Sequence, residues 1–209
     1  MADPALPPWL AWVREIEALC QSGLTYGRDP FDVQRYERLL QIAAEILQQH
    51  THLPVNHWLE DFSAQQGYAT PKVDVRGAVI HHGEILLVKE RADGRWCMPG
   101  GWADVGDSPS ATVTREVREE SGYEVLARKV IGVYDANRSG RPLSLYHAYK
   151  VVFLCELTGG QPQPSDETAA VGFFSFDALP PLSANRTDER HLSEVKAHWI
   201  DGARPTAFD

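Results

Sequence analysis

The feature of this sequence most suited to chemistry is a cluster of three glutamates that follows a pair of glycines. Glu116 and Glu120 are one helical turn apart and Glu119 lies beside them, so a helix would present all three carboxylates within an arc of roughly 100°. Like charges at this spacing repel, and the negative end of the helix dipole adds to the repulsion. A solvated acidic face is the ordinary alternative. A bound divalent cation would make the cluster favourable, and carboxylate oxygens suit Mg²⁺ or Mn²⁺ rather than zinc.

The helix that must carry these carboxylates has clear ends in the sequence. Ser108 is placed to cap it, Pro109 to be its first residue and Gly122 to end it. The glycine pair before the helix, Gly100-Gly101, would let backbone carbonyls approach a metal or ligand closely. The pattern therefore predicts a loop followed by a helix over Pro109–Ser121.

This loop and helix resemble the Nudix box. The residues that match its fixed positions are Gly101, Arg115, Glu116, Val117, Glu119, Glu120, Gly122 and Tyr123. Agreement at this many positions over residues 101–123 is highly specific. The one departure is Asp107, where the family usually has glutamate. Aspartate keeps the charge but is one methylene shorter, which affects the bracing of the loop by Arg115 more than activity.

The resemblance implies a site that holds one or more divalent cations, Mg²⁺ or Mn²⁺, against a diphosphate. Carried over by position, Glu116 and Glu120 would be the principal metal ligands, with Glu119 and the Gly100 carbonyl as further ligands. The cations would offset negative charge, polarise phosphorus and lower the pKa of an attacking water. The products would be a nucleotide and a phosphorylated partner.

Residues with a direct part in the reaction are expected to be Glu119, Glu167 and Arg115. Many family members take the general base from a loop after the last long strand, and here that loop, residues 162–168, contains Asp166 and Glu167. Glu167 is therefore the candidate base. Glu119 on the helix is its rival, and an ordinary exposed loop acid is the alternative for Glu167.

Arginines near the expected pocket are candidates for binding the substrate. Arg76 lies on the first strand and Arg91 follows the second, and either guanidinium could hold a phosphate with two hydrogen bonds. Arg95 and Arg138 are also near the expected pocket. His147 falls in a strand-like run, where facing the sheet is favoured over facing the pocket.

The elements around this site change in character along the chain. Residues 1–67 show three amphipathic helical stretches, and residues 73–209 show strand-like runs around the inserted helix. Strands surrounding one helix favour an α+β or α/β/α domain with a mixed sheet. The resemblance implies that this is an α/β/α Nudix sandwich, preceded by a small all-helical N-terminal domain and joined to it by Tyr68–Lys72.

The expected boundaries follow from caps, turns and β-branched runs. The first helix is expected to stop at Ser22-Gly23, the second to begin after Asp29, and the third to run from near Pro54 to Gly67. The expected strands and closing helix cover residues 73–81, 84–89, 124–134, 145–157 and 171–176, and then 188–199.

The N-terminal helices carry aromatic-rich stripes that they cannot bury by themselves. These stripes comprise Trp9, Trp12, Ile16 and Leu19 on one helix and Val55, Trp58 and Phe62 on another. We expect a homodimer through these helices, since soluble oligomers favour twofold symmetry. Packing within one chain is the alternative, and a base-stacking role for the tryptophans is disfavoured by their helical spacing.

Composition limits the possible partners and environments. The formal net charge of -9 argues against general affinity for nucleic acid, which needs a surplus of Lys and Arg. The three widely spaced cysteines are expected to be reduced core residues rather than disulfides or zinc ligands. There is no signal-peptide pattern or run of about 20 apolar residues, so a cytoplasmic protein without membrane contact is expected.

Further similarity favours one branch of the family. The segments 71–77, 100–106 and 179–183, together with the helical N-terminus, resemble members that act on nucleoside diphosphates linked to X. CDP-choline or a related CDP-alcohol is the first expected substrate, giving CMP and a phosphoalcohol, and ADP-ribose is the second. The alternatives from other classes are a nucleotide-sensing Nudix module without catalysis and an RNA-processing nuclease.

Overall fold

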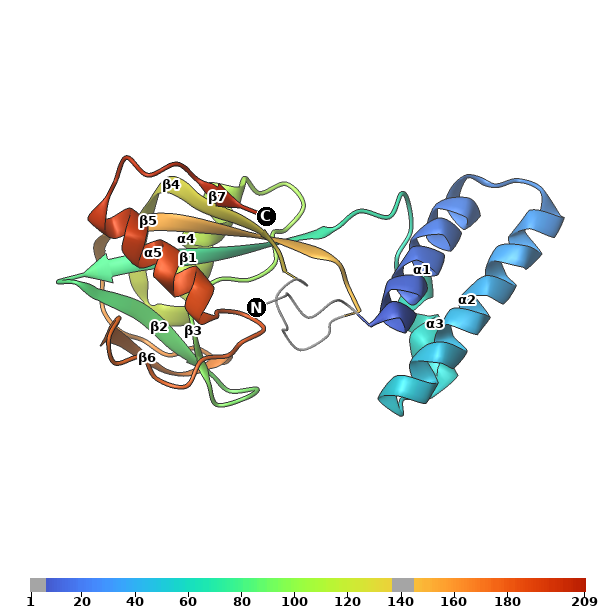
Figure 1. The fold of residues 1–209 in the computed structure, drawn as a ribbon, viewed down its shortest axis with the longest axis horizontal. Coiled ribbons are helices and arrows are strands. Elements are labelled where there is room, and N and C mark those ends of the chain that lie inside the picture. Colours follow the sequence, from blue (N-terminus) through green and yellow to red (C-terminus); the bar gives the residue numbers. More distant parts are fainter. Residues whose placement is uncertain (1–6, 137–144) are drawn as a thin grey trace. The chain divides into compact units, whose positions relative to one another are not determined.

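The computed structural model describes residues 7–136 and 145–209. The chain divides into two compact units (Figure 1). The described residues of the first are 7–71 and 145–147, and those of the second are 72–136 and 148–209.

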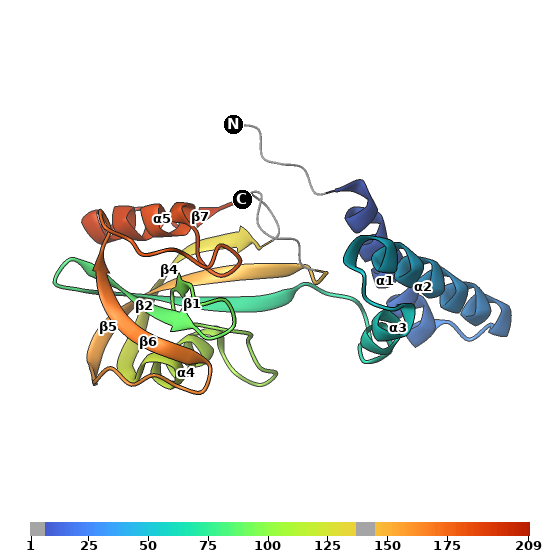
Figure 2. The same ribbon diagram turned by 90° about the horizontal axis from the view of Figure 1, so that it is seen from below.

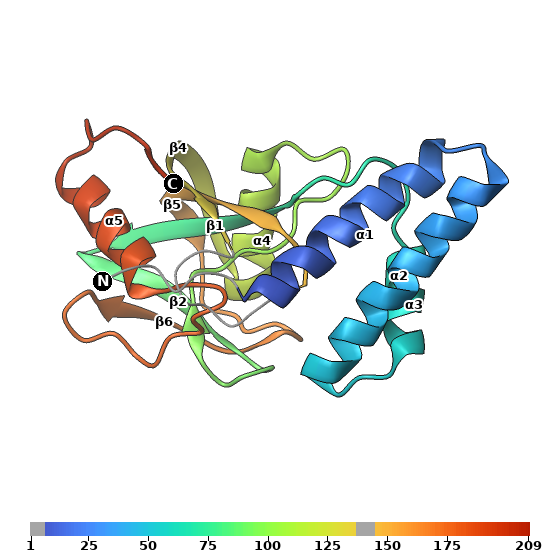
Figure 3. The same cartoon turned by 45° about the vertical axis from the view of Figure 1, so that its right-hand side comes forward.

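The first unit is made of helices whose apolar residues recur at helical spacing. These are α1 (Pro8–Tyr26), α2 (Pro30–Thr51) and α3 (Val55–Ser63), and Figure 3 shows them side by side. As predicted, Asp29 caps α2, accepting hydrogen bonds from the backbone N–H groups of Phe31 and Asp32. The buried residues of the shared core are Val13, Ala43, Ala44, Leu47 and Phe62.

The predicted ends of two of these helices are wrong. α1 does not stop at Ser22-Gly23 but continues to Tyr26. The Tyr36 ring of α2 packs where a Cβ on Gly23 would lie, 2.4 Å from the ring, so helix packing outweighs the low helix propensity of glycine. α3 ends at Ser63, before the expected end at Gly67.

The second unit is built on a mixed sheet, as predicted. In its described part the strand order is β3-β2-β1-β5-β4-β7, with β6 paired to β2. β1 runs parallel to β5, whereas β4 and β5 are antiparallel. The strands are β1 (Lys72–His81), β2 (Glu84–Glu90), β3 (Trp96–Cys97), β4 (Tyr123–Asp135), β5 (Ala148–Gly160), β6 (Thr168–Ser175) and β7 (Ala207–Phe208).

Two helices cover opposite faces of this sheet (Figure 2). α4 (Pro109–Ser121) buries Val113 and Val117 against Val75 and Val79 of β1. α5 (Glu189–Ile200) lies on the other face, with Leu192 and Val195 in a separate core that includes Ile131, Tyr134 and Val152. The alternation of side chains along each strand produces these two cores, and the predicted α/β/α arrangement is confirmed.

Strand β5 starts later than the sequence predicted. It begins at Ala148 rather than Leu145, because the residues before it belong to the first unit. There, Arg14 Nε donates to the Leu145 carbonyl at 2.9 Å and the Tyr146 hydroxyl donates to the Asp61 carboxylate. The two-residue strands β3 and β7 are also absent from the prediction, because so short a run carries no alternation.

The three cysteines, Cys20, Cys97 and Cys155, are buried and free, as predicted. Within the described residues, no helix combines the length and the apolar character needed to span a membrane.

Candidate active site

The helix that carries the glutamates begins and ends where the sequence predicted. Ser108 Oγ accepts a hydrogen bond from the Ala111 backbone N–H at 3.2 Å, and Pro109 is the first residue of α4. At the other end Gly122 has φ 76° and donates to the Arg118 carbonyl at 2.8 Å. Because both ends are capped locally, the register of the carboxylates on the helix is fixed.

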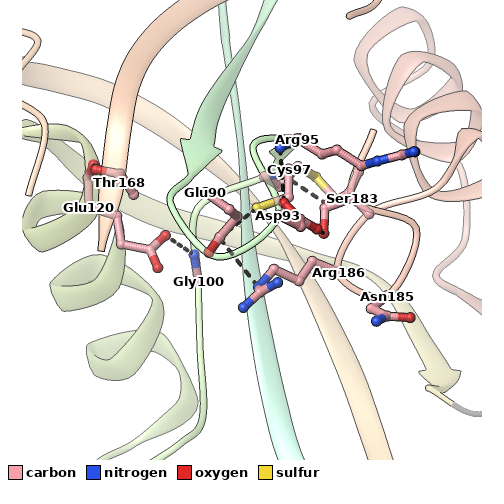
Figure 4. A network of polar contacts seen from close by, with 12 residues as sticks. Glu90, Asp93, Arg95, Cys97, Gly100, Glu120, Thr168, Ser183, Asn185 and Arg186 are labelled. Carbon is pink, nitrogen blue, oxygen red and sulfur yellow. Dashed lines mark hydrogen bonds and ion pairs between the residues drawn. The ribbon is translucent and has the colours of Figure 1, made fainter. Parts of the chain in front are cut away.

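Glu120 is held against the glycine loop. Its side chain is buried, and its Oε2 accepts a hydrogen bond from the Gly100 N–H at 2.9 Å (Figure 4). Gly100 has φ 143°, and a Cβ there would lie 2.0 Å from the Val75 carbonyl oxygen. Only glycine fits this position. On the opposite side of Glu120, the Thr168 hydroxyl donates to its backbone carbonyl at 2.8 Å.

The pKa of Glu120 is raised to about 7, chiefly by burial and to a smaller extent by the nearby carboxylates of Glu90 and Glu116. Arg76 and the Gly100 N–H oppose this rise. The pKa of Glu116 is also raised, again chiefly by burial, while Arg115 lowers it. The helix therefore presents carboxylates that hold their negative charge less readily than exposed glutamates do.

Arg115 gathers the acidic residues around the exposed side of the helix. Its Nη1 lies 2.7 Å from Glu116 Oε1 and 3.2 Å from Glu119 Oε2. Its Nη2 lies 3.0 Å from Asp104, and its Nε lies 3.6 Å from Asp107. One guanidinium thus connects the loop to the helix. Asp107 contacts Arg115, the residue through which it was expected to brace the loop.

A cavity of about 1280 Å³ lies along the exposed face of α4. Its walls bring together Arg91, Arg115 and Glu119 with Asp166 of the loop before β6. Arg91 fixes this loop, since its backbone N–H donates to the Glu167 carbonyl at 3.0 Å. Its guanidinium also donates to the Ser165 carbonyl at 3.3 and 3.4 Å.

Comparison with known proteins agrees with this geometry. A model of the NUDIX domain matches residues 71–195, which is more than half of the chain. The chain belongs to the Nudix hydrolase family. A second model, described as a UDP-X-like N-terminal oligomerisation domain, matches residues 7–60.

Similar proteins extend over most of the chain. The Bacillus subtilis (strain 168) protein named "Putative ADP-ribose pyrophosphatase YjhB" is 38% identical over 96% of this chain and 97% of its own length. The crystal structure of a UDP-X diphosphatase is 32% identical, covers 96% of this chain and 98% of that chain, and has a TM-score of 0.62. The crystal structure of an ADP-ribose pyrophosphatase from Streptococcus suis is 41% identical and has a TM-score of 0.61. It covers 67% of this chain and 100% of that chain.

Nudix hydrolases use divalent cations such as Mg²⁺, and the donors of this site suit such a cation. Glu116, Glu119 and Glu120 offer carboxylate oxygens only. A Cβ on Gly101 would lie 2.8 Å from Glu116 Oε2, so the glycine leaves space over that carboxylate. Among the described residues no three His, Cys, Asp or Glu side chains are arranged to hold a metal. Glu116 is turned to Arg115, and it would have to exchange that partner for a cation.

The other basic residues expected near the pocket have different positions. Arg76 is buried, and its guanidinium donates to the Asp74 carboxylate and to the Met98 carbonyl. Its burial gives the expected phosphate contact no support, and that contact stays a prediction. Arg95 donates to the Leu182 carbonyl, and His147 lies before β5 instead of within it. Arg138 lies outside the described residues.

Three residues near the site were not anticipated from the sequence: Glu90, Thr168 and Arg186. Glu90 ends β2, and its Oε1 lies 3.3 Å from Arg186 Nε and accepts a hydrogen bond from the Cys97 thiol at 3.0 Å. These contacts join segments far apart in the chain, so no local spacing reveals them. The run Glu84–Glu90 also contains Glu84 and Lys89, so a charged residue at its end did not single out Glu90.

Proposed function

We propose that the protein hydrolyses the diphosphate bond of a nucleoside diphosphate linked to a second group, using Mg²⁺ or Mn²⁺. The observation that carries this proposal is the placement of three glutamates on α4, one of them hydrogen-bonded to the Gly100 loop. A negatively charged substrate needs positive charge at such a site, and a divalent cation supplies it and lowers the pKa of the attacking water.

The proposed roles are those that the resemblance to the Nudix box implies. Glu116 and Glu120 are the principal cation ligands, with Glu119 and the carbonyl of Gly100 as further ligands. Arg115 holds the loop and the helix together through its four carboxylate partners. Arg91 borders the same cavity, which supports a contact with the substrate in addition to its hold on the loop.

The general base is Glu167 or Glu119. Glu167 lies in the loop that Arg91 fixes, two residues beyond Ser165 in the cavity wall. Glu119 lines the cavity itself and is 60% exposed, although it is paired with Arg115. A base must reach the attacking water, and both residues are on segments that border the cavity.

The substrate is one of a small set of compounds. CDP-choline or a related CDP-alcohol is the first candidate from sequence resemblance, and ADP-ribose is the second. The names of two relatives, both ADP-ribose pyrophosphatases, favour testing ADP-ribose with equal priority. The UDP-X diphosphatase adds UDP-linked compounds to the set, and a UDP-sugar represents them in the test below.

A non-catalytic sensor and an RNA-processing nuclease are the competing functions. Sensors of this fold usually lose box carboxylates, whereas Glu116, Glu119 and Glu120 are all present. The net charge of -9 disfavours a nucleic-acid substrate.

The proposed domains are a helical domain over residues 1–67 and a hydrolase domain over residues 73–209. The match to an oligomerisation domain supports a homodimer through the helices. Trp12 and Leu19, both on the predicted stripe of α1, are 59% and 62% exposed. Such apolar side chains supply the surface that a partner copy would cover. A cytoplasmic location stays a prediction.

The test is a substrate panel of CDP-choline, ADP-ribose, a UDP-sugar and a short RNA, each incubated with the full-length protein and Mg²⁺. Released phosphate is measured after treatment with a phosphatase. We expect rapid turnover of at least one of the three nucleotides and none of the RNA. Binding without turnover of any compound would favour the sensor, and RNA cleavage alone would favour the nuclease.

A further inference from the structure

Glu90 is a buried carboxylate outside the glutamate-bearing helix. Its side chain is 6% exposed, and among the described residues its Oε1 contacts the Cys97 thiol and Arg186 Nε. A buried carboxylate is costly unless such partners satisfy it. Arg186 therefore offsets a charge that the fold buries.

This pair lies next to the proposed cation site. Figure 4 shows the carboxylates of Glu90 and Glu120 on either side of the Gly100 backbone, with Arg186 extending toward Glu90 from its own loop. The charge of Glu90 reaches Glu120, since it contributes to the raised pKa of that residue after the larger effect of burial. Arg186 thus pairs with a carboxylate whose charge acts on a proposed metal ligand.

The guanidinium of Arg186 is fixed at one edge and open at the other. Its Nε pairs with Glu90 at 3.3 Å, and its side chain is 34% exposed. Within residues 7–136 and 145–209 its two Nη atoms form no hydrogen bond or ion pair, although the Asp93 carboxylate is near enough to interact electrostatically with the guanidinium. An arginine in this state presents a planar fork that matches the geometry of a phosphate.

The segment around Arg186 is held in place independently of any ligand. The Ser183 hydroxyl donates to the Asp93 carboxylate at 2.7 Å. The Thr187 hydroxyl accepts a hydrogen bond from the Met98 N–H at 2.9 Å. Because the backbone on both sides is anchored, little conformational entropy remains to be lost when the open edge binds an anion.

We propose that Arg186 binds a phosphate oxygen of the substrate diphosphate through its two Nη atoms, and that Glu90 is the positioning residue that fixes its Nε. The proposal rests on the proposed function, because it takes the diphosphate to lie at the carboxylates of α4. It adds a phosphate contact that comes from the 182–187 segment and not from the box.

The first experiment measures binding without turnover. Methylenediphosphonate and α,β-methylene-ADP are each titrated calorimetrically into the protein with Mg²⁺, since neither P–C–P bridge can be hydrolysed. Loss of a charge-assisted hydrogen bond should weaken both probes about tenfold or more in Arg186→Gln. Arg128→Gln is the matched control, because Arg128 forms an exposed pair with Glu156 on the sheet, and its affinities should stay unchanged.

Two further variants separate binding from structure. Glu90→Gln keeps the side-chain shape but removes the charge, so it should weaken both probes only while Arg186 is present. The double variant should then bind no more weakly than Arg186→Gln alone. Arg186→Lys, which keeps the charge but lacks the fork, should show intermediate affinity, and it replaces Arg186→Gln if that variant does not fold.

The outcomes are distinct. Equal weakening of both probes with an unchanged unfolding temperature supports a phosphate contact. A folded Arg186→Gln protein that binds both probes like the wild type, or loses only the nucleoside-bearing probe, overturns the proposal. Wild-type protein that binds both probes but hydrolyses nothing in the substrate panel would refute the proposed function and leave the phosphate contact standing.

Discussion

The two units depart from the usual distribution of side chains in opposite directions. The hydrolase unit buries charge: Lys150, Glu90 and Glu120 are 1%, 5% and 7% exposed. The helical unit instead leaves large apolar side chains in water, among them Trp12 and Leu19. Charged groups are seldom buried unless they are paired, and exposed apolar faces mark contact surfaces.

Buried charge and exposed apolar side chains both cost free energy, and each cost is compatible with a different function. In the hydrolase unit, burial makes the ionisation of Glu120 sensitive to a cation or a substrate, which is useful for chemistry. In the helical unit, exposure of Trp12 and Leu19 costs free energy that association with a partner would recover. Each function can be tested by removing the cation, the buried charge or the exposed apolar side chains.

Removal of the divalent cation is expected to have the largest effect. With a chelator, hydrolysis of the best panel substrate should fall to background, because the α4 carboxylates then repel the diphosphate. Added Mg²⁺ or Mn²⁺ should restore it, as measured by phosphate release. The unfolding temperature in chelator serves as the control for folding. Undiminished hydrolysis in the chelator would contradict a cation-dependent mechanism.

Neutralising the buried carboxylate should have the next largest effect. Glu120→Gln should lower turnover by about a hundredfold or more, on the order of 3 kcal/mol in the barrier, since a ligand loses its charge but keeps its shape. Steady-state kinetics measure this change. Glu124→Gln, at an exposed position just beyond the helix, is the control. If Glu120→Gln keeps half of the wild-type turnover, Glu120 is not a principal ligand.

Cation affinity should depend on pH through the same group. The pKa of Glu120 is raised to about 7, chiefly by burial, so the cation-free folded protein holds a proton there below that pH. A cation must displace this proton, and affinity should therefore fall about tenfold for each pH unit below 7 and level off above it. Calorimetric titration of Mn²⁺ at several pH values tests this. The range from about pH 5 to 7 covers most of the rise in the pKa of Glu120. An Mn²⁺ affinity that does not change over this range would exclude Glu120 as the titrating ligand.

Removing the exposed apolar surface should alter assembly. The double variant Trp12→Glu and Leu19→Glu should convert a dimer to a monomer, because charges would have to be buried at the contact. Light scattering should then give about half of the wild-type mass, as expected for twofold assembly. Glu124→Gln, at an exposed position in the hydrolase unit rather than on α1, is the control. A monomeric wild-type protein would show that the α1 stripe has no partner copy.

The smallest effect on activity is expected at the departure from the family pattern. Asp107→Glu should change turnover by less than about tenfold, under ~1.4 kcal/mol. Asp107 contacts Arg115 at 3.6 Å, and a longer carboxylate can make the same contact. The same kinetic assay applies. A larger change in either direction would mean that Asp107 touches the metal or the substrate.

Local signals made the central helix predictable from sequence. Ser108, Pro109 and Gly122 lie within or next to α4 and define its ends without help from the rest of the chain. The same holds for Asp29 at the start of α2. The predicted boundaries were wrong where tertiary packing decides them. Packing against Tyr36 lets α1 continue past Gly23. The residues before β5 form hydrogen bonds with Arg14 and Asp61 and therefore belong to the first unit.

The site likewise contains residues that local sequence predicts and residues that only tertiary contacts bring together. The carboxylates of α4 follow from their spacing, but the Glu90–Arg186 pair joins β2 to a segment near α5 and has no counterpart in local sequence. Arg76 was expected to meet phosphate because it lies on the right strand. The spacing of Asp74 and Arg76 places both on one face of the strand, but it does not indicate that both are buried and that Asp74 accepts hydrogen bonds from the guanidinium.

The buried thiol of Cys97 offers a spectroscopic view of this site. Burial raises its pKa well above the usual value, so it stays protonated and donates to Glu90. The vibrational frequency of an S–H bond falls as its hydrogen bond strengthens, and the Cys155 thiol makes a longer contact, 3.7 Å, to a carbonyl. A difference infrared spectrum against Cys97→Ala would therefore isolate one band. Its shift on addition of a diphosphate would report, without any label, whether Glu90 and its arginine respond to the ligand.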